Sequence, residues 1–286
     1  MKITVINGTA QRGVTYHMKE LFLDHLRSGS EITEFYPADL PPFCTGCKAC
    51  FLRGEQLCPH AEKTMPVWNS MLDADLLVFA YPVYALRAPA SVKSLLDHLC
   101  VHWMVHRPDE RMFSKTAVIL TNSVGAPNGS AQKDVETSLS WMGVSAVYPC
   151  GAGMMGDILW ETISPAHVEM LRRKTDRLYE KVRNLQPRSM KLRVRAKFFL
   201  CKRLHQMVLK SEETPSLDNR HYLERGWIRK RGIGSLPQVI LYNPDRTIPA
   251  SVNAGCLPLR GGLSLVSYRC KAPKPFGAKL IKKCIA

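Results

Sequence analysis

The sequence predicts an α/β fold built on a doubly wound, five-stranded parallel sheet, with extra helices and an irregular segment towards the carboxyl end. Three observations predict it. Short apolar runs alternate with amphipathic helical patterns along the first 187 residues. The run Leu76–Ala80 is continuously apolar, as expected of a strand that is buried on both faces. A turn at Pro82 and a helical pattern ending near Leu99 follow this run and complete half of a βαβ unit.

The remaining elements follow from the same patterns. Apolar and β-branched runs predict strands, and apolar residues spaced three and four apart predict helices between them. The expected strands are Lys2–Ile6, Glu31–Tyr36, Leu76–Ala80, Lys115–Thr121 and Ser145–Cys150. The expected helices are one that ends near Arg27, then His60–Leu72, Ala90–Val105, Ala131–Met142 and Pro165–Asn184, with Thr15 and Ser164 as the N-caps of the first and the last.

Composition narrows the class of protein. Hydrophobic residues make up 45% of the chain, which is ample for a packed core, and no apolar run approaches the roughly 18 residues of a membrane span. The start of the chain, MKITVINGTA, lacks the apolar stretch of a signal peptide, so we expect a cytoplasmic protein. The net charge of +16 is uneven, because eleven Lys or Arg and one acidic residue follow Ile228.

The loop after the first strand, Asn7–Tyr16, is rich in glycine and hydroxyl groups and leads into a helix. Backbone N–H groups and the helix dipole favour a phosphate at such a point. The alternative is an ordinary βα turn, since the loop is neither a Walker A nor a GxGxxG sequence.

Two further loops follow strands three and four, at Tyr81–Ala90 and Asn122–Ser130. Because the carboxyl ends of parallel strands meet at one edge of a sheet, we expect these loops to converge with Asn7–Tyr16. This arrangement predicts a mononucleotide site with the phosphate on the first loop and a ring between the other two.

Four cysteines follow the spacing C-x2-C-x2-C-x7-C, at Cys44, Cys47, Cys50 and Cys58. This spacing lets thiolates converge on one centre, as iron–sulfur and zinc sites require, and Gly46 permits a tight turn. The alternative is a set of partly buried free thiols, one of them redox-active. A clustering of this kind in a reducing compartment favours metal or redox chemistry over disulfides.

Three histidines, His98, His102 and His106, are spaced four apart on one helix face. Such a face can hold a metal, and more often it lines an interface or a pocket. Trp103 beside them suggests a pocket wall.

These residues resemble the flavodoxin-like NAD(P)H-dependent FMN reductase family over about Met1 to Trp227. The resemblance is carried by the sequences NGTAQRGVT, CTGCKAC and YPVY, by Lys93 and Asp97 downstream, and by the loop Thr121–Gly125. It implies a sheet order of 2-1-3-4-5, bound FMN with NAD(P)H as co-substrate, and a homodimer. In this family the flavin carries the chemistry, so no catalytic side chain is named, and Tyr84 and Trp103 are expected to shape the acceptor pocket.

The resemblance also implies which residues meet FMN. Residues of the first loop would hold the phosphate, those after strand three would lie along the isoalloxazine ring, and those after strand four would meet its pyrimidine side. In that order they are Thr9, Gln11, Val14, Thr15 and Tyr16; Pro82, Val83, Tyr84 and Ala85; and Asn122, Ser123, Val124 and Gly125.

Two other functions compete with an oxidoreductase that passes hydride to a quinone, a nitro-compound, a flavin or a redox carrier protein. The cysteine segment resembles that of iron–sulfur flavoproteins, which would place a [4Fe–4S] cluster on Cys44, Cys47, Cys50 and Cys58 for electron transfer. The third hypothesis is a non-enzymatic binding module that acts through its basic C-terminal region.

The sequence predicts three regions along the chain. Residues 1–187 form the FMN-binding domain, 188–228 a basic helix and strap, and 229–286 a Pro- and Gly-rich basic extension that we expect to be disordered. Val194, Phe198, Cys201, Leu204 and Val208 predict one apolar face on the basic helix. We expect that face to pack on the domain or its dimer mate, with peripheral membrane contact through 188–210 as the less favoured alternative and no specific nucleic acid.

Overall fold

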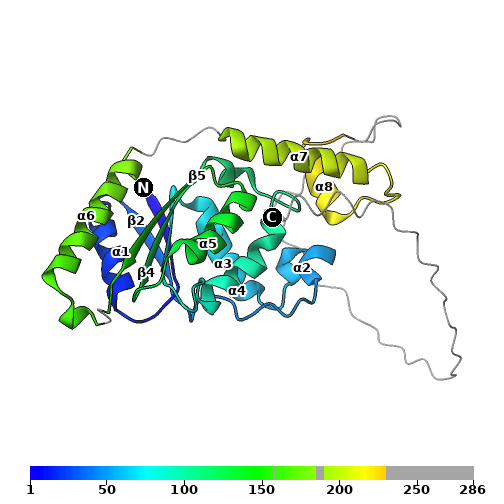
Figure 1. Ribbon diagram of the computed structural model, residues 1–286. Coiled ribbons are helices and arrows are strands. Elements are labelled where there is room, and N and C mark those ends of the chain that lie inside the picture. Colours follow the sequence, from blue (N-terminus) through cyan, green and yellow to red (C-terminus); the bar gives the residue numbers. More distant parts are fainter. Residues whose placement is uncertain (157–158, 185–189, 230–286) are drawn as a thin grey trace, which may run out of the picture. The chain divides into compact units, whose positions relative to one another are not determined.

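The computed structural model describes residues 1–156, 159–184 and 190–229, and these contain a parallel sheet with helices on both faces (Figure 1). The order across the sheet is β2-β1-β3-β4-β5, and every neighbouring pair is parallel. This confirms the predicted flavodoxin-like topology. The strands are β1 (Lys2–Asn7), β2 (Glu31–Phe35), β3 (Leu76–Pro82), β4 (Thr116–Ser123) and β5 (Ala146–Gly153).

The helices lie in two layers. In Figure 1, α1 and α6 cover one face of the sheet, and α3, α4 and α5 cover the other. The α-helices are α1 (Val14–Asp24), α2 (Ala49–Leu52), α3 (Ala61–Asp73), α4 (Ala90–Leu99), α5 (Gly129–Met142), α6 (Pro165–Val182), α7 (Leu192–Val208) and α8 (Leu217–Glu224). Short 3₁₀ turns occur at Glu55–Leu57, Cys100–His102, Glu110–Ser114 and Trp160–Thr162.

The central strand β3 explains why its sequence is continuously apolar. Successive side chains of a strand point to opposite faces, and both faces of this sheet are covered. Leu77, Phe79 and Tyr81 belong to the core beneath α3, α4 and α5, whereas Leu76, Val78 and Ala80 belong to the core beneath α1 and α6. The carboxyl end of β3 is therefore held in place by core packing on both faces of the sheet.

Two predicted helix ends are wrong. The helix expected over Ala90–Val105 ends at Leu99, because the chain tightens into a 3₁₀ turn and the Met104 N–H donates to the Trp141 carbonyl at 2.8 Å. Thr15 is not an N-cap, since Gly13 occupies that position. Ser164 is the predicted cap of α6, and its side chain accepts a hydrogen bond from the His167 N–H at 3.3 Å.

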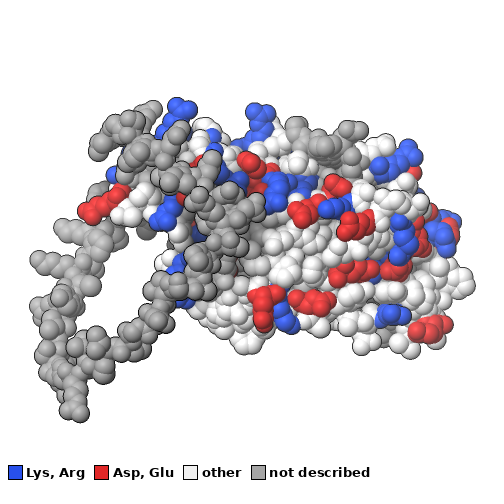
Figure 2. Space-filling view, turned by 180° about the vertical axis from the view of Figure 1, so that it is seen from behind, with Lys and Arg blue, Asp and Glu red and all other residues white. Residues whose placement is uncertain are grey.

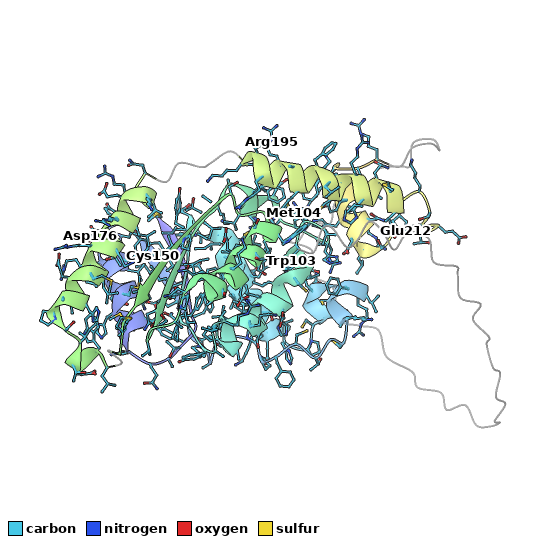
Figure 3. The ribbon with its side chains drawn as sticks, in the orientation of Figure 1. Trp103, Met104, Cys150, Asp176, Arg195 and Glu212 are labelled. Atoms are coloured by element: carbon cyan, nitrogen blue, oxygen red, sulfur yellow. The ribbon has the colours of Figure 1, made fainter. Side chains whose placement is uncertain are left out.

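The helix α7 packs on the domain with a face slightly different from the predicted one. Val194 and Cys201 are buried as expected, and His205 is buried as well. Leu204 and Val208 are instead 44% and 49% exposed. Arg195 projects from α7 away from the sheet (Figure 3). The helix thus presents both basic and apolar side chains to its surroundings.

Charge is mixed on the face shown in Figure 2, where Lys and Arg side chains are interspersed with Asp and Glu. The predicted extension 229–286 lies, apart from Arg229, outside the described residues. Within the part of the chain that the structure describes, no helix has the length and apolarity needed to cross a bilayer.

Candidate cofactor site and cysteine-rich site

A cavity of about 470 Å³ lies at the carboxyl edge of the sheet, and we call it the edge cavity. Small-molecule sites typically measure about 300–1,000 Å³. The three loops predicted from the sequence meet here, and a segment after β5 joins them. The lining residues are Thr9, Gln11, Arg12, Gly13, Val14, Thr15, Pro82, Tyr84, Asn122, Val124, Leu159, Trp160 and Glu161.

The N-terminus of α1 forms one wall of the edge cavity. Gly13 is the N-cap residue, and no side chain caps the helix. The first N–H groups of α1 are therefore not taken up by a capping side chain, and the helix dipole adds a positive potential. Arg12 brings a guanidinium to the same wall. This set of donors and positive charge fits a phosphate group.

Asn122 ties the three loops together. The Thr15 hydroxyl on α1 donates to Asn122 Oδ1 on β4. The Val83 N–H after β3 donates to the Asn122 carbonyl at 2.8 Å. The hydroxyl of Thr15, which lies inside the first turn of α1, thus connects that helix to β4.

The turn after β3 holds Tyr84 at the rim of the edge cavity. Tyr84 and Arg87 exchange backbone hydrogen bonds of 3.1 and 2.9 Å, and the two residues between them, Ala85 and Leu86, have φ of 49° and 64°. Non-glycine residues rarely adopt this left-handed conformation, and they tend to occur at ligand-binding loops. The turn leaves Tyr84 55% exposed.

Five predicted residues belong to these loops without lining the edge cavity. Val83 packs against the core instead, and the Ser123 hydroxyl donates to the Ala126 carbonyl within its own loop. The residues that do not line the cavity are Tyr16, Val83, Ala85, Ser123 and Gly125. Trp103, expected near an acceptor pocket, stacks on Trp141 with ring centroids 6.0 Å apart and does not line this cavity either.

The segment Leu159–Glu161 is part of the site that sequence reasoning missed. Trp160 stacks on His17 of α1, with centroids 4.0 Å apart and planes 11° apart. Burial lowers the pKa of His17, so the ring against Trp160 favours its neutral form. The position of this segment after the fifth strand was the available clue, because the carboxyl end of β5 meets the same sheet edge.

A second cavity, of about 80 Å³, is lined by all four predicted cysteines, and we call it the cysteine cavity. Cys44 and Cys47 are exposed, whereas Cys50 and Cys58 are half-buried. Cys100, at the end of α4, is a fifth thiol on the same cavity. Sequence spacing did not reveal Cys100, because it lies 42 positions beyond Cys58.

Left-handed backbone folds the cysteine segment into a compact loop. Gly46 has φ of 70°, as predicted for a tight turn, and Gly54 and Lys48 have φ of 118° and 61°. Arg107, which is only 6% exposed, anchors this loop through hydrogen bonds. Its guanidinium donates to the Cys50 carbonyl and to Glu55 Oε2, the latter at 3.2 Å.

Burial keeps two of these thiols protonated. It raises the pKa of Cys100 to about 11, and the neighbouring Cys50 and Cys44 add to the increase. Burial also raises the pKa of Cys50, with Cys58 as the next cause. A metal or cluster stabilises thiolates directly, so thiols around one cavity have the donor chemistry of a metal or iron–sulfur site. The four predicted cysteines share this cavity, but among the described residues no three of their sulfur atoms lie within 4.8 Å of one another.

The three histidines spaced four apart do not converge. His102 stacks on Trp68 with centroids 3.9 Å apart, and burial lowers its pKa to about 4. His106 Nδ1 lies 2.8 Å from Asp218 Oδ2. His98 instead meets His60, with Nε2 and Nδ1 2.9 Å apart. The alternative of one metal held by all three histidines is therefore wrong, whereas His98 and His102 line the cysteine cavity, in line with the favoured interpretation as pocket lining.

Comparison with known proteins identifies the family. Residues 1–155 match the NADPH-dependent FMN reductase family. The chain belongs to this family. The matched residues include all five strands and the three loops around the edge cavity. Members of this family are flavoprotein oxidoreductases. The loops after β1, β3 and β4, which the resemblance assigns to FMN, all contribute residues to the lining of the edge cavity.

Two curated relatives are iron–sulfur flavoproteins. The chain is 26% identical over 164 residues to the one from Methanosarcina thermophila, covering 56% of this chain and 83% of the relative. It is 25% identical over 149 residues to the one from Archaeoglobus fulgidus, covering 52% of this chain and 64% of that relative.

Among solved structures, the NAD(P)H:quinone oxidoreductase from Methanothermobacter marburgensis is similar in fold. The TM-score is 0.50 at 16% identity, over 65% of this chain and 98% of that one.

Proposed function

We propose that the protein binds FMN in the edge cavity and passes hydride or electrons from NAD(P)H to a small acceptor. The acceptor would be a quinone, a nitro-compound, a flavin or a redox carrier protein. The observation that carries the proposal is the meeting of the uncapped α1 N-terminus and the loops after β3 and β4 around one cavity of about 470 Å³. When bound, FMN supplies the redox chemistry, and the protein supplies position.

Each loop would have a separate task. Thr9, Gln11 and the first turn of α1 would bind the phosphate through hydroxyl, amide and backbone N–H donors. Pro82 and Tyr84 would pack along the ring, and Asn122 would hold its polar edge. Because Asn122 also accepts from Thr15, the phosphate wall and the ring wall would be aligned by one side chain.

A homodimer would cover apolar side chains that the rim leaves exposed. Tyr84 and Val124 on the lining of the edge cavity are 55% and 51% exposed. Met155 is 80% exposed and precedes Gly156, whose N–H donates to the Val124 carbonyl at 2.9 Å. We propose that a second copy packs near this rim. Light scattering on the full chain with and without FMN measures this directly, and a monomer at all concentrations would contradict it.

The test of the main proposal is flavin binding and turnover on the full chain. We expect one FMN per chain, and NADH or NADPH oxidation that depends on added quinone. An Asn122→Ala variant should lose FMN affinity, whereas a Cys150→Ser variant, altered on the α6 side of β5, should retain it. A chain that neither retains FMN nor binds it when it is added would overturn the proposal.

A second candidate function is electron transfer through a [4Fe–4S] cluster as well as flavin. The specific observation in its favour is that Cys44, Cys47, Cys50 and Cys58 line one small cavity. Iron and sulfide analysis of anaerobically purified protein tests it. Equal amounts of iron and sulfide, lost on Cys44→Ser substitution, would establish the cluster, whereas flavin without iron would leave a simple FMN reductase.

The third hypothesis, a non-enzymatic binding module, is not favoured by membership in an enzyme family. Interaction through the basic residues 188–210 remains a separate prediction. The exposed apolar side chains of α7, among them Phe199 at 61% and Met207 at 66%, are the part of that segment available for contact.

A further inference from the structure

Three potential metal ligands converge at the edge of the cysteine cavity. The ligand atoms of Cys58, His60 and His98 all lie within 4.8 Å of one another. Cys58 and His60 flank a turn before α3, and His98 comes from the last turn of α4. Among the residues that the structure describes, no other trio of His, Cys, Asp or Glu ligand atoms is this close.

The hydrogen bonds of His98 orient one lone pair towards His60. His98 Nδ1 lies 2.8 Å from the Ser94 carbonyl, which can only accept, so His98 carries its proton on Nδ1. His98 Nε2 is then an acceptor, and His60 Nδ1 donates to it at 2.9 Å. A cation between the two rings would require His60 to carry its proton on Nε2 in place of Nδ1, which would leave His60 Nδ1 and His98 Nε2 as neutral imidazole donors.

The hydrogen bond between His98 and the Ser94 carbonyl is of the kind that normally supports a metal-binding histidine. A ligating imidazole usually donates its other N–H to a backbone carbonyl or a carboxylate, which fixes the ring and its tautomer. The Nδ1–H of His98 does this with Ser94. His98 is also buried, at 6% exposed, so its ring orientation is restrained by packing.

We propose that Cys58, His60 and His98 form a mononuclear site for a zinc-class divalent ion. One thiolate and two imidazoles are ligand types that Zn²⁺ prefers, and three protein ligands leave a fourth position for water or a further donor. Cys58 and His98 both line the cysteine cavity, so the fourth position opens onto it. The proposal does not depend on FMN.

The site competes with the iron–sulfur alternative for one residue. A [4Fe–4S] cluster on the four predicted cysteines would use Cys58, and so does the mononuclear site. The two differ in their other ligands, because zinc requires His60 and His98, whereas the cluster requires Cys44 and Cys47. Substitution of these residues therefore separates the two readings.

The experiment uses the full chain, stripped of metal with a chelator and titrated with Co²⁺ and then Zn²⁺. We expect one Co²⁺ per chain with a thiolate-to-cobalt absorption band, displaced by one Zn²⁺. His60→Ala and His98→Ala should each weaken Zn²⁺ binding by at least about 100-fold, since even supporting residues of such sites contribute 10–100-fold. Cys58→Ser should remove the thiolate band.

Matched controls keep the test specific. His25→Gln changes a histidine on the opposite face of the sheet, paired with Asp176, and should leave Zn²⁺ affinity unchanged. Cys44→Ser should also leave it unchanged. His60 is only half-buried, so His60→Ala tests the site even where His98→Ala fails to fold, which circular dichroism reports.

Three results would overturn the proposal. They are no Co²⁺ or Zn²⁺ binding by the stripped chain, binding that survives in His60→Ala, and binding that is lost in Cys44→Ser. FMN content of the same variants is an independent readout, because none of the three proposed ligands lines the edge cavity. An unsubstituted chain that binds Zn²⁺ but no FMN would contradict the proposed function and leave the metal site standing.

Discussion

Gly8 follows β1 in the loop Asn7–Tyr16, at a point where the backbone lies close to the end of β3. Its N–H donates to the Ala80 carbonyl at 2.8 Å. A Cβ at this position would lie 2.4 Å from Tyr81 Cβ and 2.9 Å from Val92 Cγ2. Both neighbours are fully buried, so neither can move easily.

We therefore predict that Gly8→Ala lowers the free energy of unfolding by about 1–3 kcal/mol and weakens FMN binding. Denaturant unfolding and flavin titration measure the two effects. Gly153→Ala is the matched control, because a Cβ there meets nothing within 4 Å. Equal stability of the two variants would contradict the close-packing argument.

Lys19 is a buried cation beneath the first loop. Its side chain is 0% exposed, and its Nζ lies 2.6 Å from Glu34 Oε2 and 2.9 Å from Glu20 Oε1. Burial would raise the pKa of Glu34, but hydrogen bonds from Lys19 and Asn7 outweigh it and hold that pKa below its usual value. The pair thus connects α1 to β2.

We predict that Lys19→Met destabilises the protein by about 3 kcal/mol at neutral pH, because it leaves the Glu34 carboxylate without its cation. A lowered pKa contributes stability above the unfolded-state value, and that contribution is lost as pH falls through the folded-state pKa. The gap between wild type and variant should therefore narrow in acid. Adding Glu34→Gln should rescue part of the loss at neutral pH, and an unchanged deficit in the double variant would contradict this account.

The helix α8 is linked to the cysteine segment through the carboxylate of Asp218. Asp218 accepts from Arg107 and lies 2.8 Å from His106 Nδ1, and Arg107 in turn holds the Cys50 carbonyl. Burial would raise the pKa of Asp218, but hydrogen bonding to His106 and the charge of Arg107 lower it.

The lowered pKa predicts how α8 responds to pH. The stabilising contribution of Asp218 is complete above its unfolded pKa of about 3.9 and is lost as pH falls through the lower folded value. We expect the amides of α8 to be strongly protected from hydrogen exchange at neutral pH, relative to an unstructured chain at the same pH, and weakly protected in strong acid. Asp218→Asn should show fast exchange at pH 7, and slow exchange in that variant would show that apolar packing alone holds the helix.

The sheet was predictable from the sequence and several helix details were not. All five strands appear within a few residues of their predicted bounds, because strands buried on two faces form continuous apolar runs. The pattern around Val101 and Met104 continues the apolar spacing of α4, although the backbone has already left the helix there. The apolar pattern reports burial, and these residues stay buried beyond the point where the helical hydrogen bonds end.

The candidate sites divide in the same way. The loops after β1, β3 and β4 were predictable, because parallel topology alone brings their strand ends together. Trp160, Cys100 and His60 were missed, because each enters its site through a contact with a distant part of the chain. Such pairings depend on how the helices pack, and local spacing does not encode them.

For the whole molecule, the boundary of the functional unit is predicted to lie after Arg229. Every described residue that lines the edge cavity or the cysteine cavity precedes it. Tyr222 and Ile228 are buried, so the chain from α8 to Ile228 belongs to the folded core. A chain ending at Arg229 should therefore keep the FMN stoichiometry and reductase turnover of the full chain.

A chain ending at residue 189 should lose stability, because it exposes Met104 and Phe113 and leaves Arg107 without Asp218. Flavin content and thermal unfolding of both truncations measure this. Loss of flavin from the longer one would mean that residues 230–286 take part in binding the cofactor.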